Sequence, residues 1–370
     1  MSMARVLARW TDDTLESPLA VDVAIEDRRI VGPSLAFGCI DYDGARRPFT
    51  LDEVGVIAFG PGGGSMLEVS GHGARAAPFF TDPRIGALTT DEEVEIARPG
   101  AFRDWFDLRF AQRQVMMCSM ALSGRVLTLT GRMSVFRADL ATHPDFITQV
   151  QSDYIDHWRL GRVQFLTGDD KSTWFWLLRN GYRMAYLPDV STLSMESQPT
   201  PTFTGSAVTL MIRWFGNMLR TNGRALALPP AQIGLFTWWS LLDQRLGIWT
   251  TLAGPISVIL GTFLVSPWTL PAYLGWVMFT RYAMCALLAL VRRRGFPVTW
   301  PFLLYFGQIV GAGVKSYIMF RLDRQRWTRQ SAATGTRATT PSFETRLRDW
   351  SSLHAHALAL GWLTFGVVVL

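Results

Sequence analysis

The chain has 370 residues, of which 49% are hydrophobic, and it includes 15 Trp and 23 Phe, so it can bury a sizeable core and also place helices in lipid. Its formal net charge of +6 comes with basic clusters beside apolar runs, which favours membrane topology and argues against a nucleic-acid partner. Three cysteines without metal-ligand spacing argue against a zinc site and against a disulfide framework.

The amino-terminal segment, residues 1–53, is atypical because short apolar stretches alternate with charges and glycines and predict no clear element. Its first thirty residues lack a continuous apolar core, so we expect no secretory signal and a soluble part that stays in the cytoplasm.

Strands and helices alternate over residues 54–200. The predicted strands are residues 54–59, 85–89, 126–130 and 182–187. The predicted helices are residues 102–120, 153–160 and 172–180. Ser172 could cap the last of these helices, and Gly181 closes it. The alternation predicts an α/β domain that binds a nucleotide sugar.

Apolar and amphipathic helices are predicted after residue 200. Residues 201–230 carry an Arg-rich amphipathic pattern that is typical of a helix lying in the membrane interface. The region 231–370 is predicted to lie in the membrane, with spans near residues 247–265, 271–291 and 354–370. The three arginines that follow the second span place its end in the cytoplasm.

Residues 301–320 are apolar, but basic clusters flank them on both sides, so we predict an interfacial or re-entrant helix carrying Gln308 and Lys315. Arg281 inside the second span is costly in lipid, so we expect it to face protein or a polar channel, or else to snorkel.

A Gly-Asp-Asp turn at residues 168–170 is the strongest candidate for chemistry. Displacing a nucleoside diphosphate from a sugar needs a base for the acceptor hydroxyl and positive charge for the leaving group. Asp170 suits the base, because it lies at the start of a predicted helix beside a second carboxylate, Asp169. The alternative is that both carboxylates only cap that helix.

Several segments together resemble one known family. They are residues 82–92 (DPRIGALTTDE), 109–113 (RFAQR), 127–134 (LTLTGRMS), 155–162 (IDHWRLGR) and 165–172 (FLTGDDKS). These segments resemble the alginate-polymerising mannuronosyltransferases, processive inverting membrane enzymes of glycosyltransferase family 2 that are related to cellulose and hyaluronan synthases. The resemblance covers about residues 78–370. It implies a partial GT-A (Rossmann-like) domain followed by interfacial and transmembrane helices.

The resemblance implies roles for individual residues. The last Asp of the family's Gly-Asp-Asp motif is the catalytic base, which is Asp170 here, with Gly168 and Asp169 at the substrate. A Gln-x-x-Arg-Trp motif holds the diphosphate and frames the acceptor site. Arg213 and Trp214 match that motif, but Leu210 replaces its Gln.

A third family element, Trp-Thr-Arg, gates the nucleotide site and is matched by Trp327 and Arg329. Guanidinium groups can clamp phosphate oxygens, and an indole face suits a sugar ring. On general grounds the alternative is that these Arg and Trp residues only anchor helices at a bilayer surface. His157 is interpreted as a structural hydrogen-bonding residue on a helix, and the helix with Arg109 and Arg113 as a possible solvated face.

The sequence departs from the family pattern at its amino-terminal side. The family has a pair of membrane helices there and an Asp-x-Asp motif for the metal, but the matching register, residues 62–67, is glycine-rich. Residues 41–43 (DYD) are a substitute with unsuitable spacing. We therefore assign no metal ligand, although the resemblance implies Mg²⁺ as cofactor.

The resemblance implies an enzyme of the bacterial inner membrane with a cytoplasmic catalytic part. It would transfer mannuronate from GDP-mannuronic acid, the GDP-sugar donor, to a growing polysaccharide acceptor. It would contact membrane lipid and work with a cyclic-di-GMP-binding co-polymerase subunit. The alternatives are a truncated or degenerate inactive homologue and a polysaccharide channel subunit without catalysis.

Overall fold

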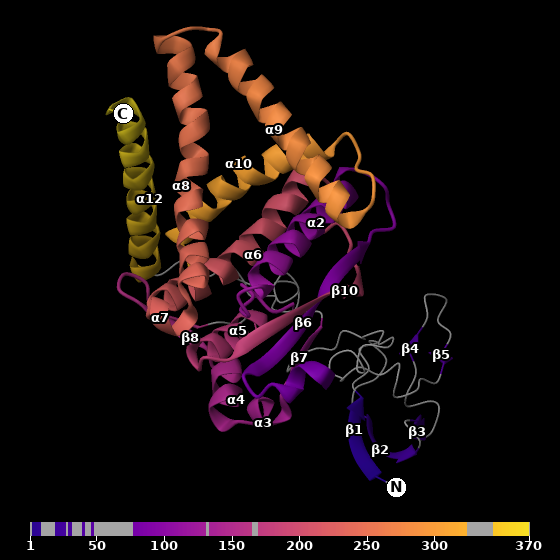
Figure 1. Cartoon of the computed structure of the whole chain (residues 1–370). Helices are drawn as coiled ribbons and strands as arrows, with labels where there is room; N and C mark the ends of the chain where they lie inside the picture. Colours follow the sequence, from indigo (N-terminus) through magenta and orange to yellow (C-terminus); the bar gives the residue numbers. More distant parts are fainter. Residues whose placement is uncertain are drawn as a thin grey trace.

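The computed structural model describes the backbone of five strands between residues 2 and 47, and residues 77–130, 133–164, 169–323 and 343–369 (Figure 1). The predicted strand at 54–59 and the residues Gly168, Trp327 and Arg329 lie outside the described residues. The five early strands are β1 (Ser2–Ala8), β2 (Leu19–Glu26), β3 (Arg29–Val31), β4 (Cys39–Ile40) and β5 (Arg46–Arg47). The first three form an antiparallel sheet, and the last two form a second one.

A three-stranded mixed sheet forms the centre of the α/β part. Its order is β10 (Arg183–Met195), β6 (Ile85–Glu95) and β7 (Ser134–Phe136), with β10 parallel and β7 antiparallel to β6. The middle strand β6 is buried from residue 86 to residue 92, because it has a neighbour on each side and helices pack against the sheet. Both β6 and β10 are longer than the predicted strands. The register of β10 shifts between Leu187 and Ser191, so Pro188 is accommodated as a bulge and does not end the strand.

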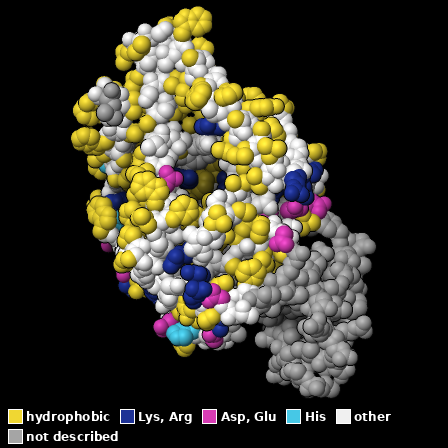
Figure 2. Space-filling model, viewed as in Figure 1, with side chains coloured by type: hydrophobic (Ala, Val, Ile, Leu, Met, Phe, Trp, Pro, Cys, Tyr) yellow, Lys and Arg dark blue, Asp and Glu magenta, His cyan; other side chains and the backbone are white. Residues whose placement is uncertain are grey.

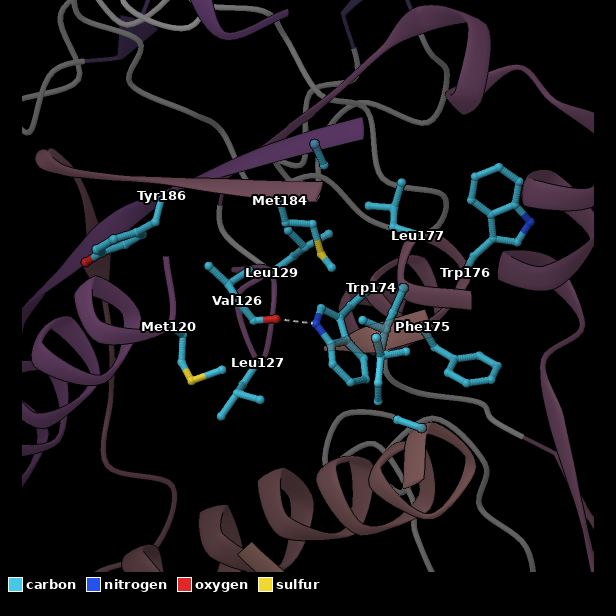
Figure 3. Packing of buried hydrophobic residues seen from close by; sticks show 14 of the residues in the cluster. Met120, Val126, Leu127, Leu129, Trp174, Phe175, Trp176, Leu177, Met184 and Tyr186 are labelled. Carbon is cyan, nitrogen blue, oxygen red and sulfur yellow. Dashed lines mark hydrogen bonds between the residues drawn. The ribbon is translucent and has the colours of Figure 1, made fainter. Parts of the chain in front are cut away.

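Helices α2 (Ala101–Ala121) and α5 (Asp169–Arg179) cover the sheet, and both agree with the predicted helices. Shorter elements near them are η1 (Ala77–Thr81), α3 (Ala138–Ala141) and α4 (Pro144–Gln151). The core between α5 and the sheet contains Trp174, Leu177 and Met184. Figure 3 shows the Trp174 indole pointing at the carbonyl oxygen of Val126, to which its Nε1 donates a hydrogen bond of 2.6 Å.

Two elements were predicted wrongly. Residues 126–130 are buried but form no strand, because the carbonyl groups of Val126 and Leu127 accept hydrogen bonds from side chains of α5. Residues 153–160 are not helical and belong to an antiparallel hairpin of β8 (Tyr154–His157) and β9 (Gly161–Gln164). Ser172 does not cap α5, since it lies inside the helix and donates a hydrogen bond to Asp153.

Gly181 ends the turn after α5 with a backbone φ of 77°, a left-handed conformation that L side chains rarely adopt. A Cβ added there would meet no atom within 4 Å, so substitution costs backbone strain alone. We expect Gly181→Ala to lower the free energy of unfolding by about 1 kcal/mol. Thermal unfolding in detergent checks this value. Gly181→Asn should lose less, because Asn tolerates this conformation, and equal losses for both variants would contradict the explanation.

The remaining helices form the apolar part of the protein. They are α6 (Phe203–Leu226), α7 (Pro230–Ile233), α8 (Leu235–Leu264), α9 (Thr269–Arg292), α10 (Trp300–Met319) and α12 (Phe343–Val369). Of these, α8, α9, α10 and α12 are long and apolar enough to cross a membrane. Large side chains such as Phe263 and Trp276 are exposed on them, as expected for a lipid-facing surface.

Helix α10 differs from the other three apolar helices. In Figure 1 it lies across the base of the upright α8 and α12 and alongside α6, and it contacts α2, α6, α8 and α9. It is also the most buried of the four. Its placement as an interfacial helix stays a prediction, as do the predicted domain boundaries.

The basic end of α9 contacts the α/β part. Arg292 donates to Gln114 at 3.0 Å and lies 3.4 Å from a carboxylate oxygen of Asp91, and Arg294 pairs with Glu93 at 3.2 Å. The arginines that the positive-inside rule assigns to the cytoplasm therefore lie on the same side of the apolar helices as the α/β part.

Candidate active site

The first turn of α5 carries the predicted base. Asp170 is half-buried, and the side chain of Asp169 is not among those described. The next residue, Lys171, points inward and donates a hydrogen bond of 3.2 Å from Nζ to the carbonyl oxygen of Leu127. Burial lowers the pKa of Lys171 to about 8, Asp170 opposes this effect, and Arg113 adds to it. A cation with an unusual pKa therefore lies directly beside the predicted base.

Helix α2 brings further charges to this position. Arg113 forms an ion pair with Glu92, a buried carboxylate on β6. The adjacent Asp91 is also buried and accepts a hydrogen bond of 2.7 Å from the hydroxyl of Tyr186. Burial raises the pKa of Asp91, against the effect of that hydrogen bond. The end of β6 thus presents two paired carboxylates towards α2.

The Arg-Trp motif lies on α6. Arg213 is half-buried, and the indole of Trp214 stacks on Trp105 of α2, with ring centroids 5.7 Å apart and planes at 22°. Arg109 of α2 lies over both indoles, 4.5 Å from the Trp214 centroid and 5.1 Å from the Trp105 centroid. Leu210, which replaces the family's Gln, packs into this apolar cluster. The substitution therefore exchanges a polar contact for core packing.

One face of α2 connects the two motifs. Arg109 and Arg113 are four residues apart and so lie on the same side of the helix. Arg113 is close enough to lower the pKa of Lys171, while Arg109 lies on Trp214. Burial, with a smaller effect of Arg113, lowers the pKa of Arg109 to about 10. The interpretation of this helix as a solvated face is wrong for these two residues.

A buried ion pair between α6 and the residue before β8 also contacts α5. Arg224 binds both carboxylate oxygens of Asp153, at 2.5 and 2.9 Å, and its guanidinium lies 4.2 Å from the ring centroid of Phe175. Asp153 also accepts hydrogen bonds from Ser172 and Gln149. Trp214 precedes Arg224 by ten residues, or about 15 Å along α6. The helix carrying Asp170 is therefore anchored to the helix carrying Trp214.

The β8–β9 hairpin contacts the ends of two apolar helices. Arg159 donates hydrogen bonds to Ser351 and Ser352 of α12, at 2.9 and 2.7 Å, and to the carbonyl oxygen of Phe320 after α10, at 2.6 Å. Trp327 and Arg329 fall between these two attachment points in the sequence, outside the described residues. His157 accepts hydrogen bonds from two backbone amides of the same turn, which agrees with a structural role, although it lies on a strand and not on a helix.

Among the described residues, no group of three or more His, Cys, Asp or Glu side chains could hold a metal ion. Asp91 and Glu92 already have protein partners, and Asp170 stands beside a lysine. The described residues therefore do not fit a complete cation site.

Figure 2 shows a hollow in one face of the molecule, over the region where Figure 1 places α6 and α10 next to each other. Lys or Arg side chains and hydrophobic side chains surround it, together with an acidic side chain on one margin. Such a surface suits a ligand that is both anionic and partly apolar.

The pKa of Lys171 predicts a pH effect on binding. At neutral pH Lys171 is protonated, and it loses its charge as the pH rises through about 8. We expect the affinity for GDP to fall over this range, because one positive charge at the site disappears. Titration calorimetry at several pH values measures it. In Lys171→Met the same pH step should vanish, and a step that persists in this variant would assign it to another group.

Comparisons with known proteins agree with the motifs. The model of a family described as "Glycosyltransferase like family 2" matches residues 70–217. A protein named "Glycosyltransferase alg8" from Pseudomonas syringae pv. tomato is 46% identical over 280 residues, which are 75% of this chain and 56% of that protein. A protein of the same name from Azotobacter vinelandii is 50% identical over 247 residues, 66% of this chain and 49% of that protein. The chain thus spans about half the length of the curated relatives it matches.

A solved mannosyltransferase from Pyrobaculum calidifontis, in complex with GDP-Man and Mn²⁺, aligns over 65% of this chain and 56% of its own, with 19% identity and a TM-score of 0.31. That similarity is too low to add to the assignment. The sequence matches and the mixed sheet with its four long apolar helices confirm the predicted family and fold class. Residues 70–217 thus form a domain of glycosyltransferase family 2, in a chain that is similar to the alg8 glycosyltransferases.

Proposed function

We propose that the protein adds mannuronate from GDP-mannuronic acid to a growing alginate chain, with inversion at the anomeric carbon. The observation that carries the proposal is the face of α2 on which Arg113 neighbours Lys171 and Arg109 covers Trp214. This face links Asp170, the proposed base, to Trp214, whose indole is proposed to bind the acceptor sugar. A family 2 domain with an alg8 relative supports the class of reaction and of product.

The chemistry assigned to these residues is a single displacement. Asp170 removes the proton of the acceptor's 4-hydroxyl group, and the resulting oxygen nucleophile attacks the anomeric carbon of the donor. The bond from that carbon to the diphosphate breaks, and GDP leaves with the electron pair. Arg213 and Lys171 supply positive charge for the anionic donor and leaving group. Attack opposite the leaving group inverts the anomeric configuration.

The remaining roles rest on the family resemblance. Gly168 and Asp169 are proposed beside the substrate, and Trp327 and Arg329 as the gate of the nucleotide site. A divalent cation, Mg²⁺, would neutralise the diphosphate, but the described residues provide no group of three or more ligands for it. A cyclic-di-GMP-binding co-polymerase subunit is the proposed partner.

We place the protein in the bacterial inner membrane with its catalytic part in the cytoplasm. The ion pair between Arg294 and Glu93, and the contact of Arg292 with Asp91, support this orientation. Residues 301–320 are proposed to lie at the interface beneath the spans, where α10 packs on α6 and α2.

The test is a transfer assay with membranes that contain the protein and its partner subunit. Labelled GDP-mannuronate and labelled GDP-mannose are supplied in parallel, and the polymer is digested with a lyase specific for polymannuronate. We expect lyase-sensitive polymer from GDP-mannuronate alone. Polymer from GDP-mannose would contradict the donor assignment. No polymer from either donor, with intact partner and membrane insertion, would favour an inactive homologue or a channel subunit.

A further inference from the structure

Two cations at the junction of α2, α6 and α10 have aromatic rings as neighbours and no acidic partner. Arg109 lies over Trp214 and Trp105, and 5.8 Å from the ring centroid of Phe215. Lys315 of α10 lies on the same Phe215 ring, with Nζ 4.6 Å from its centroid. In the part of the chain that the structure describes, neither cation forms an ion pair or a hydrogen bond.

This arrangement is costly without a ligand. Two positive charges share one neighbouring ring, and both are half-buried, so each raises the cost of the other. Cation–π contacts return only about 0.5–2 kcal/mol each. Other inward arginines of this region have polar partners, as Arg113 has Glu92 and Arg224 has Asp153. Arg109 and Lys315 are thus available to an external anion.

Helix α10 brings a polar group to the same aromatic cluster. Gly311 of α10 lies against Phe215, and Gly307 lies near the Trp105 indole, so α10 approaches the aromatic cluster closely. Gln308 precedes Lys315 by seven residues, two helical turns, and therefore shares its face of α10. The Oε1 atom of Gln308 is buried and has no hydrogen-bond partner within the described ranges. A hydroxyl group of a bound ligand could donate to it.

We infer that Arg109 and Lys315 bind the carboxylates of the acceptor polymer and so select a uronic acid chain over a neutral one. A uronate residue combines an apolar ring face, hydroxyl groups and one negative charge, which matches the indoles, Gln308 and the two cations. A diphosphate or a lipid phosphate would use the charge but not the flat aromatic faces. This inference rests on the proposed function and adds the basis of acceptor specificity.

The test measures binding of two oligosaccharides to the full-length protein in nanodiscs of phosphatidylcholine alone, which excludes anionic lipid. The ligands are a hexamer of mannuronate and an uncharged β-linked mannose hexamer. We expect Arg109→Gln and Lys315→Gln each to weaken mannuronate binding about tenfold or more, and mannose binding to change little. Arg109→Lys should restore part of the loss. Arg103→Gln, an exposed arginine on the same helix, is the matched control and should change neither affinity.

Ionic strength gives a second readout. Mannuronate binding by the wild type should weaken as salt rises, and the slope should be smaller in both Gln variants, because screened charge pairs have been removed. Equal loss of both hexamers would indicate a structural role and overturn the inference, as would unchanged mannuronate affinity in both variants. Failure of the proposed function is a different result, namely no polymer synthesis by the wild type in the transfer assay.

Discussion

Replacement of Asp170 by Asn is expected to lower the rate of sugar transfer by about 10²–10⁴-fold, because a positioned general base contributes about that much. Asn keeps the shape of the side chain but cannot accept the acceptor's proton. The affinity for GDP should change little, since the cations Lys171 and Arg213 remain. Label incorporation into polymer measures the first quantity, and titration calorimetry with GDP measures the second.

Asp156→Asn is the matched control for this prediction. Asp156 is an exposed carboxylate on β8, paired with Arg162 at 2.8 Å, and we assign it no part in the chemistry. Its replacement should leave transfer within about twofold of the wild type, as surface pairs contribute little. If Asp170→Asn retained full activity, or if both variants lost it equally, Asp170 would not be the base.

Replacement of Asp153 by Ala is expected to lower the free energy of unfolding by about 3–5 kcal/mol, because removing one partner of a buried pair leaves the other charge uncompensated. Asp153 is buried and accepts hydrogen bonds from Arg224, Ser172 and Gln149. Loss of the carboxylate would leave Arg224 against Phe175 without its anion. Thermal unfolding in detergent, followed by circular dichroism, measures the change.

The control again comes from the same hairpin. Asp156→Ala removes an exposed carboxylate three positions away, and its pair with Arg162 should be worth about 0–1 kcal/mol. A large difference between the two variants is therefore expected. Similar losses, or no loss in Asp153→Ala, would show that the pair of Asp153 with Arg224 is not what holds α5 and α6 together.

The spacing of apolar residues along the chain predicted the long helices. The aromatic spacing of residues 102–120 predicted α2 within one residue at each end. The predicted spans fall on α8, α9 and α12, although α8 and α12 begin well before the predicted spans. Strand β6 was predicted to end at Thr89, ahead of the acidic residues 91–93. The strand continues, since those carboxylates meet Tyr186, Arg113 and Arg294 from distant parts of the chain.

The hairpin at residues 154–164 also depends on contacts that a local sequence pattern does not reveal. Its acidic and aromatic residues resemble a helix when they are read alone. In the structure Asp156 stands opposite Arg162 on the neighbouring strand, and the Arg162 guanidinium lies 4.1 Å from the Tyr154 ring centroid. Cross-strand pairs of this kind are invisible to a periodicity measured along the chain.

For the site, the sequence predicted the motifs and helix α2, but not that α2 joins the motifs. Asp170, Arg213 and Trp214 were found from their resemblance to a family. Arg109 and Arg113 carry the connection, and their spacing of four residues on an aromatic helix was a usable signal. Their partners, Trp214 and Glu92, lie on other elements and required the tertiary structure.

A structure of the full-length protein with GDP and a mannuronate oligosaccharide tests the central claim most directly. The claim is that a single site extends along α2 from Asp170 to Trp214. We predict the terminal 4-hydroxyl within about 3 Å of an Asp170 carboxylate oxygen, with the chain passing the indole of Trp214. An oligosaccharide bound away from α2, or a terminal hydroxyl beyond the reach of Asp170 with Trp214 uncontacted, would contradict it.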